Sequence, residues 1–178
     1  MTDLVRKYAS FCDSPFGKRL MQREADYVRR ELEGCRRILD IGCGIGVFEQ
    51  KLPEFDMIGL DSSPDMLCEA GKRCSNQFVL GQATRLDFED SSFDAVLFVT
   101  SLEFMEDYRP ALDEAARVLR PGGRLLVMML NIESAYFAEH SKREGSFFRQ
   151  VKHTDPKAVQ DYVSRRFSAS GVRRFPLS

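Results

Sequence analysis

The feature that most constrains the fold is a glycine loop that follows a buried apolar run. Residues 38–41, Ile-Leu-Asp-Ile, are typical of a strand covered on both faces. Gly42, Gly44 and Gly46 follow at alternate positions, and an apolar, helix-like stretch comes next. Glycine accepts positive φ angles and lets a ligand approach the backbone closely. Taken alone, such a loop serves a dinucleotide, a phosphate or simply a tight turn.

The spacing of the glycines narrows this choice. The order is G-x-G-x-G, whereas the dinucleotide fingerprint G-x-G-x-x-G needs a glycine where Val47 stands. Asp40 lies at the end of the predicted strand, just before the loop. A carboxylate there repels a pyrophosphate and attracts an ammonium group. We therefore expect a ligand with a cationic amino group near the loop.

The rest of the chain alternates strand-like and helix-like segments. Apolar runs that suit buried strands lie at residues 57–60, 78–80, 95–99 and 125–130. Helices are expected at about 16–33, from Ser63-Pro64, at about 110–119 and over 155–167. This alternation predicts an α/β, Rossmann-like, doubly wound fold, with a mostly parallel sheet and helices on both faces. Ligands bind such folds at the carboxyl ends of the strands, where the strand order reverses.

Asp61 ends the second predicted strand. A carboxylate at that point suits a ribose diol, because it accepts hydrogen bonds from two hydroxyl groups. The alternative is an aspartate that caps the turn at Ser62-Ser63-Pro64. Its position beside the glycine loop favours the ribose.

Composition and charge exclude several classes of protein. The 178 residues fit one domain, and their net charge of −1 gives no bulk attraction to nucleic acid or to a membrane. The five cysteines form no CxxC pair, and the chain has no apolar leader, so we expect a cytoplasmic protein. Cys68 and Cys74 with His140 or His153 match no tight zinc-ligand spacing, so no metal is expected.

Five segments, in order, resemble the motifs of class I S-adenosylmethionine-dependent methyltransferases. They are residues 40–46, 59–67, 81–88, 92–96 and 117–125. Tyr8, Phe11 and residues 13–17 resemble the leading segment of small methyltransferases related to the quinone-biosynthesis group. The resemblance implies one domain over 1–178, with an N-terminal helical lid (1–34), a cofactor-binding core (35–130) and a substrate-side and C-terminal segment (131–178).

The resemblance also implies a cofactor and a reaction. The cofactor is S-adenosylmethionine, S-adenosylhomocysteine is the product, and the methyl acceptor is a small molecule rather than nucleic acid. Asp40 and Gly42 hold the methionine part, and Asp61 binds the ribose. The family often has an acid where Gln82 stands, so contact with the adenine is altered. The implied cofactor-binding residues are Asp40, Gly42, Cys43, Gly44, Gly46, Asp61, Ser62, Met66, Gln82, Ala83, Thr84, Thr100, Ser101 and Leu102.

This fold has no universal catalytic residue, because the sulfonium methyl is already activated and the protein mainly aligns the nucleophile and excludes water. Glu103 is a candidate base, or simply an acid at the start of a helix. Tyr8 lines the pocket or is an ordinary aromatic. His140 is a base from a lid or a structural histidine. An aromatic and basic stretch over 136–152 caps an apolar, anionic acceptor or packs as a solvated face.

Two alternatives concern the C-terminus and the function. The family completes its sheet with two further strands, but only residues 171–177 suggest one. An incomplete sheet leaves an exposed edge, which favours a homodimer. The short C-terminus and Gln82 leave open a non-catalytic module that binds S-adenosylmethionine or serves as a regulatory partner. Val47 and Asp40 count against a nicotinamide oxidoreductase.

Overall fold

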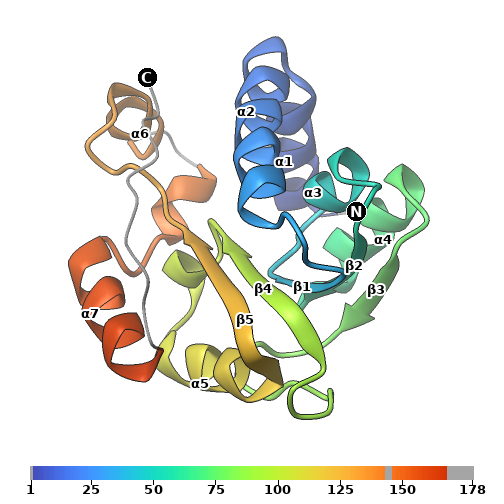
Figure 1. Ribbon diagram of the computed structural model, residues 1–178. Helices are drawn as coiled ribbons and strands as arrows, with labels where there is room; N and C mark the ends of the chain where they lie inside the picture. The colour runs from blue at the N-terminus through green and yellow to red at the C-terminus, as the bar shows by residue number, and fades with distance from the viewer. Residues whose placement is uncertain (1, 143–145, 168–178) are drawn as a thin grey trace.

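A single parallel sheet forms the centre of the computed structural model, which describes residues 2–142 and 146–167 (Figure 1). Its order is β3-β2-β1-β4-β5, and every pairing is parallel. The strands are β1 (Arg37–Ile41), β2 (Asp56–Asp61), β3 (Gln77–Leu80), β4 (Phe93–Val99) and β5 (Leu119–Met128). The predicted Rossmann-like, doubly wound fold is confirmed.

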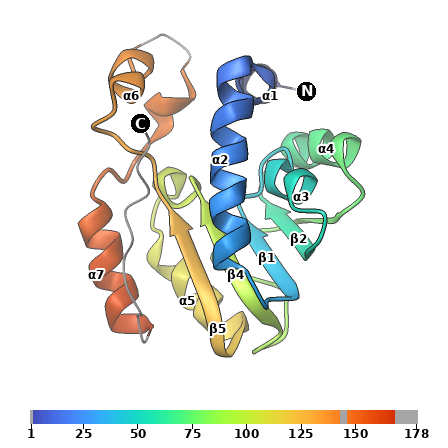
Figure 2. The same ribbon diagram turned by 45° about the horizontal axis from the view of Figure 1, so that its top comes forward.

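Helices cover both faces of the sheet (Figure 2). One face carries α1 (Asp3–Asp13), α2 (Pro15–Glu31), α3 (Val47–Lys51) and α4 (Pro64–Arg73). The other carries α5 (Arg109–Val118) and α7 (Pro156–Arg166). Three short elements, η1 (Leu102–Phe104), α6 (Ala135–His140) and η2 (Phe147–Gln150), follow β4 and β5. The chain thus places its irregular segments at the carboxyl ends of the strands.

Alternation along the strands divides the core into two clusters. Ile38 packs against α1–α3, whereas Leu39 and Ile41 pack against the side of α5 and α7. Because successive side chains of a strand point to opposite faces, Asp40 shares the face of Ile38. Every residue of β4 is buried, which explains why its sequence is a continuous apolar run apart from Asp94.

Helix starts follow the expected capping chemistry. Ser63 Oγ accepts a hydrogen bond from Met66 N (3.3 Å), and Pro64 opens α4. Asp155 Oδ1 accepts from Lys157 N (2.9 Å) at the start of α7. Two elements differ from expectation. The N-terminal segment forms two helices, since Ser14 and Pro15 end α1 and begin α2.

Strand β5 also differs from the predicted run at 125–130. Leu119 pairs with Phe93 and Arg124 pairs with Ala95, so Pro121-Gly122-Gly123 bulges within the strand instead of preceding it. Gly122, at φ +77°, permits the bulge. The strand predicted over 171–177 lies outside the described residues.

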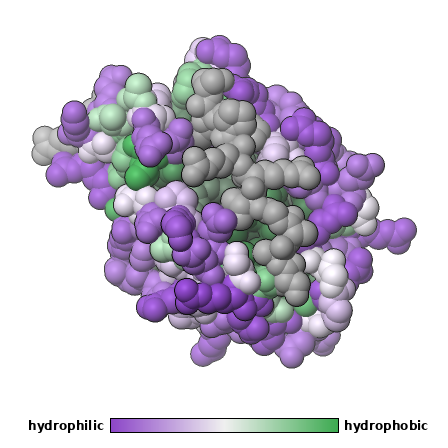
Figure 3. All heavy atoms as spheres, turned by 60° about the vertical axis from the view of Figure 1, so that its left-hand side comes forward, coloured by the Kyte–Doolittle hydropathy of each residue, from purple (hydrophilic) through white to green (hydrophobic). Residues whose placement is uncertain are grey.

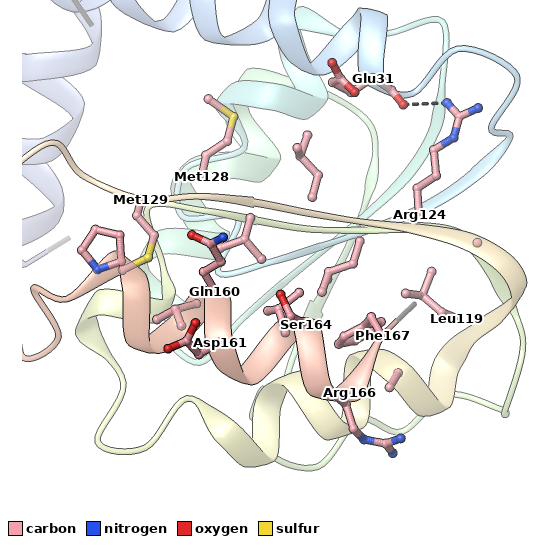
Figure 4. Close-up of a pocket in the computed structure, with 18 of the residues that line it drawn as sticks. Glu31, Leu119, Arg124, Met128, Met129, Gln160, Asp161, Ser164, Arg166 and Phe167 are labelled. Atoms are coloured by element: carbon pink, nitrogen blue, oxygen red, sulfur yellow. Dashed lines mark hydrogen bonds between the residues drawn. The ribbon is translucent and has the colours of Figure 1, made fainter. Parts of the chain in front are cut away.

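A groove follows the outer edge of β5, with which no other described strand pairs. It is lined by α2 on one side and by α7 on the other, with Met128 and Met129 between them (Figure 4). Arg124 Nη1 donates to the carbonyl oxygen of Glu31 (2.6 Å) across one end. Apolar residues interrupt the mostly hydrophilic surface on this side of the molecule (Figure 3). None of the residues of the glycine loop lines this groove.

The corner between α1 and α2 requires glycine. A Cβ atom at Gly17 would lie 1.9 Å from the carbonyl oxygen of Phe11, a backbone atom that cannot move alone. We expect Gly17→Ala to lower the free energy of unfolding by about 1–3 kcal/mol. Gly71→Ala is the matched control: nothing lies within 4 Å, and alanine in α4 should stabilise by about 0.5–1 kcal/mol. Urea denaturation measures both, and equal effects of the two variants would refute the close approach.

Candidate functional site

The site lies where β1 and β4 end side by side at the centre of the sheet. The chain leaves β1 toward the face of α3 and leaves β4 toward the face of α5, so the strand order reverses there. Ser101, after β4, donates from Oγ to the carbonyl oxygen of Ile41 (2.8 Å). A Cβ atom at Gly42 would lie 2.5 Å from the Ser101 Cβ. The two segments predicted to meet the cofactor are therefore in contact.

The glycine loop needs all three of its glycines. Gly42, Gly44 and Gly46 have φ angles of +82°, +57° and +71°, in the left-handed region that other residues enter at a cost. The backbone N–H groups of Gly42 and Cys43 donate to the carbonyl oxygen of Leu60 (2.7 and 3.1 Å). The loop is thus fixed to the end of β2.

Asp61 connects the loop to the turn after β2. Its Oδ2 accepts from Gly44 N (2.9 Å), and its Oδ1 accepts from Ser63 N (2.8 Å). Burial raises the pKa of Asp61, although these backbone hydrogen bonds oppose the shift. The turn-capping role is therefore present. Each carboxylate oxygen accepts more than one hydrogen bond, so the ribose role stays a prediction beside it.

Asp40 has a buried carboxyl group that binds nothing within the described chain. The residue is only 1% exposed, and neither of its carboxyl oxygens has a hydrogen-bond partner among the described residues. Burial, with a smaller effect from Asp61, raises the pKa of Asp40 to about 7. A buried carboxylate without a donor is costly, and a cationic N–H donor removes the cost. The side chain therefore fits the ammonium group of S-adenosylmethionine.

The remaining predicted cofactor residues differ in exposure. Ser62, Gln82 and Thr84 are exposed at the ends of β2 and β3. Cys43, Met66 and Leu102 are buried. The Leu102 side chain packs in the core cluster that includes residues of α5. Thr100 has φ +48°, and Ala83 is half-buried; both lie in turns at strand ends.

Helix α1 covers the glycine loop (Figure 1). The Tyr8 ring lies 3.4 Å from the position of a Cβ atom at Gly44. Arg73 of α4 donates two hydrogen bonds to Asp13 at the end of α1 (3.0 and 2.9 Å). Asp65 Oδ2 accepts from Thr2 N (2.8 Å) at the start of the same helix. Both ends of α1 are therefore attached to α4, and Tyr8 lies over the loop.

Glu103 is buried in η1 and ties together three segments. Its Oε1 accepts from Leu130 N (2.5 Å), just after β5. Its carbonyl oxygen accepts from the N–H groups of Lys152 (2.7 Å) and His153 (3.2 Å). Oε2 has no partner among the described residues. Burial raises the pKa of Glu103 to about 7. Glu103 is the middle residue of η1, a single short turn, and its main contacts are to other segments.

Aromatic rings connect helix α1 with η1, the segment after β4. The Phe147 ring lies 4.3 Å from that of Phe104 and 5.5 Å from that of Tyr8, between centroids. The His140 ring stacks on Tyr136 (3.8 Å), and its Nδ1 lies 2.9 Å from the Tyr136 carbonyl oxygen. This packing favours the structural interpretation of His140. The contact of Phe104 with Phe147 has no signal in the sequence, because 42 residues separate them.

Neither a metal site nor a membrane helix is found in the part of the chain that the structure describes. No group of three or more His, Cys, Asp or Glu side chains in residues 2–142 and 146–167 is arranged to hold a metal ion. No helix in the same ranges is both long and apolar enough to cross a membrane.

Comparison with known proteins points to one family. Residues 39–127 match the profile of a family described as a methyltransferase domain, and this range runs from β1 into β5. The demethylmenaquinone methyltransferase of Corynebacterium efficiens is 36% identical over 168 residues, covering 90% of this chain and 70% of that protein. The protein of the same name from Deinococcus radiodurans is 38% identical over 102 residues, covering 52% and 42%. The chain spans about half the length of several such relatives.

A solved structure agrees with this match. A methyltransferase from Thermotoga maritima, described as S-adenosylmethionine-dependent and as a possible histamine N-methyltransferase, superposes with a TM-score of 0.75. It is 28% identical, and the alignment covers 92% of this chain and 77% of that one.

The contacts of Glu103 make a stability prediction. Glu103→Ala leaves the partly buried Leu130 N–H without its acceptor, so we expect a loss of about 1–3 kcal/mol in the free energy of unfolding. Glu103→Gln keeps an acceptor oxygen and should lose less. Hydrogen exchange at the Leu130 amide, with urea denaturation, checks both. Equal losses in the two variants would mean that the hydrogen bond contributes nothing.

The variant Glu103→Gln also tests the ionisation of Glu103. Folding raises the pKa of Glu103 from 4.5 to about 7. Between pH 4.5 and about 7, the folded protein therefore keeps a proton on Glu103 that the unfolded chain has released. Stability therefore falls as pH rises from about 4.5 to about 7. We expect a smaller fall for Glu103→Gln, measured as the midpoint of unfolding at pH values across this window.

Proposed function

Because this chain belongs to the class I S-adenosylmethionine-dependent methyltransferases, in a group related to quinone biosynthesis, we propose that it transfers a methyl group from S-adenosylmethionine to a small-molecule acceptor. The observation that carries the proposal is the carboxyl group of Asp40. It is buried, has no hydrogen-bond partner among the described residues, and lies beside the glycine loop at the point where the strand order reverses.

The residues around the loop would bind different parts of the cofactor. Asp40 would take the ammonium group, and the backbone of Gly42 and Gly44 permits close approach of the methionine part. Asp61 keeps acceptor capacity for the ribose hydroxyls beyond its two backbone hydrogen bonds. The exposed turn at Gln82 would meet the edge of the adenine, where the Gln82 side-chain oxygen accepts from an amino group.

Bound S-adenosylmethionine supplies a methyl group on a positively charged sulfur that leaves with the bonding electrons. The protein then has two tasks, which are to orient the acceptor and to keep water out. Tyr8 and the rings of Phe104 and Phe147 close the space above the loop. Glu103 is occupied by Leu130, so we propose that it positions the segments around the acceptor rather than acting first as a base.

For the acceptor we propose a planar, apolar ring of the quinone class in its reduced, electron-rich form. The names of the curated relatives support this class. The aromatic side chains Tyr8, Phe104 and Phe147 support it independently, because rings pack well against rings. The ring carbon gains the methyl group and loses its hydrogen as a proton, so the reaction is balanced without an oxidant.

Cellular setting and assembly are further proposals. The described cysteines Cys12, Cys35, Cys43, Cys68 and Cys74 are all free thiols, which suits a reducing cytosol. Within residues 2–142 and 146–167, no strand pairs with the outer edge of β5, which supports pairing of two copies there.

Binding of the cofactor tests the site. Asp40→Asn removes the negative charge that faces the ammonium group, and we expect S-adenosylmethionine affinity to fall by about 10- to 100-fold, the range of a charge-assisted hydrogen bond. Asp61→Asn should weaken binding by about tenfold. Asp56→Asn is the control, because Asp56 is exposed at the opposite end of β2. Titration calorimetry gives the affinities, and unchanged binding in Asp40→Asn would show that the site is misplaced.

Turnover tests the acceptor. The protein is incubated with S-adenosylmethionine and either a reduced demethylated naphthoquinone or histamine, and S-adenosylhomocysteine is measured. We expect product with the quinol and none with histamine. Phe147→Ala should raise KM for the quinol by about tenfold with unchanged cofactor affinity, because a ring contact is lost.

Two outcomes would contradict the acceptor proposal. Turnover of the amine instead of the quinol would replace the acceptor class. Tight cofactor binding without product from any acceptor tested would favour the non-catalytic module.

A further inference from the structure

Glu49 is a second buried carboxyl group that the proposed function does not use. It lies on α3, just after the glycine loop, and it is 0% exposed. Neither Oε1 nor Oε2 has a hydrogen-bond partner among the described residues. Burying a carboxyl group without a hydrogen bond is energetically costly, so the burial of Glu49 calls for a reason.

The carboxyl group of Glu49 lies next to that of Asp40. Asp40 pairs with Gly59 across β1 and β2, and neighbouring residues of paired strands are about 4.8 Å apart with side chains on the same face. A Cβ atom at Gly59 would lie 2.6 Å from Glu49 Oε1. Glu49 therefore occupies the space that a side chain at position 59 would fill, beside Asp40.

Among the described residues, the groups that interact with this pair add no positive charge. Asp61 faces it from β2, Cys43 from the loop, and Cys74 from the end of α4. Tyr8 of α1 lies near Asp40, and Glu24 of α2 lies near Tyr8. Arg73, a cation on α4, is bound to Asp13 and Glu69.

Burial and mutual repulsion keep a proton on such a pair. Burial, with the nearby charge of Asp40, raises the pKa of Glu49 well above its usual value. Two carboxyl groups that share one site titrate as a unit, and the second ionisation is strongly disfavoured until a cation arrives. The arrival of a cation is therefore coupled to the loss of a proton.

We propose that Glu49 is a further binding residue of the cofactor site, which forms one proton-sharing carboxyl pair with Asp40 and releases that proton to solvent when the cofactor's ammonium group binds. This inference rests on the proposed placement of S-adenosylmethionine at the glycine loop. It is distinct from a purely structural role for Glu49, because only a binding role predicts a change in the number of bound protons.

Titration calorimetry of the whole chain with S-adenosylmethionine counts these protons. Binding is measured at pH of about 6.5 in two buffers that differ in ionisation enthalpy, where the ligand amine is charged. The difference in observed enthalpy gives the protons released. We expect about one for the wild type and at most half of that for Glu49→Gln, which keeps the volume and cannot ionise. Glu33→Gln, an exposed acid far from the loop, should match the wild type.

The affinity should show the same coupling. The wild-type Kd should fall by up to about tenfold for each unit of pH rise below 7, and the slope should be shallower in Glu49→Gln. No proton release by the wild type, or equal release by the wild type and Glu49→Gln, would overturn the proposal. A complete lack of cofactor binding would instead overturn the placement of the cofactor, and this inference with it.

A measurement on the wild type alone covers the case in which Glu49→Gln does not fold. Infrared difference spectra between the free and the S-adenosylmethionine-bound protein report the carbonyl band of protonated carboxyl groups. We expect this band to decrease on binding. An unchanged band would show that the pair keeps its proton and would contradict the proposal.

Discussion

Asp40 lies at the end of the central strand, and its buried carboxyl group has no hydrogen-bond partner among the described residues. The two core clusters hold β1 from both faces, so the strand cannot shift to bring the carboxylate to water. The left-handed glycines turn the backbone directly after it, and Asp61 ties the loop to β2. The burial of this carboxyl group lowers stability, and the proposed site explains it as a position that a bound cation completes.

Much of the fold could be predicted because its signals are local. The apolar runs of β1 and β4 are continuous because both faces are covered, and Ser63 and Asp155 begin helices by capping their own backbone. The loop at Gly42 could also be predicted, because few residues other than glycine adopt positive φ angles easily. The predicted strands were then expected to end at the same edge of the sheet, because parallel strands place their carboxyl ends together.

What the sequence did not reveal depends on contacts between distant residues. In the sequence, Glu49 looks like an ordinary helix residue. It is buried because Gly59 of β2 has no side chain and leaves space for it. The corner at Ser14 divides one predicted helical segment into two, because α1 must turn back over the loop. The β5 bulge depends on pairing with Phe93 and Ala95, which no local pattern encodes. Glu103 could be named as important, but not as the partner of Leu130.

The two halves of the site are therefore determined in different ways. The cofactor half comes from one continuous stretch around Asp40, joined to the ends of neighbouring strands. The proposed acceptor half consists of Tyr8, Phe104 and Phe147, on three segments that meet only in the folded chain. The rigid cofactor half suits a ligand that a whole family shares. The acceptor half, which is made of separate, short elements, changes with a few substitutions. That division explains why the methyl donor can be read from the sequence while the acceptor has to be inferred from packing.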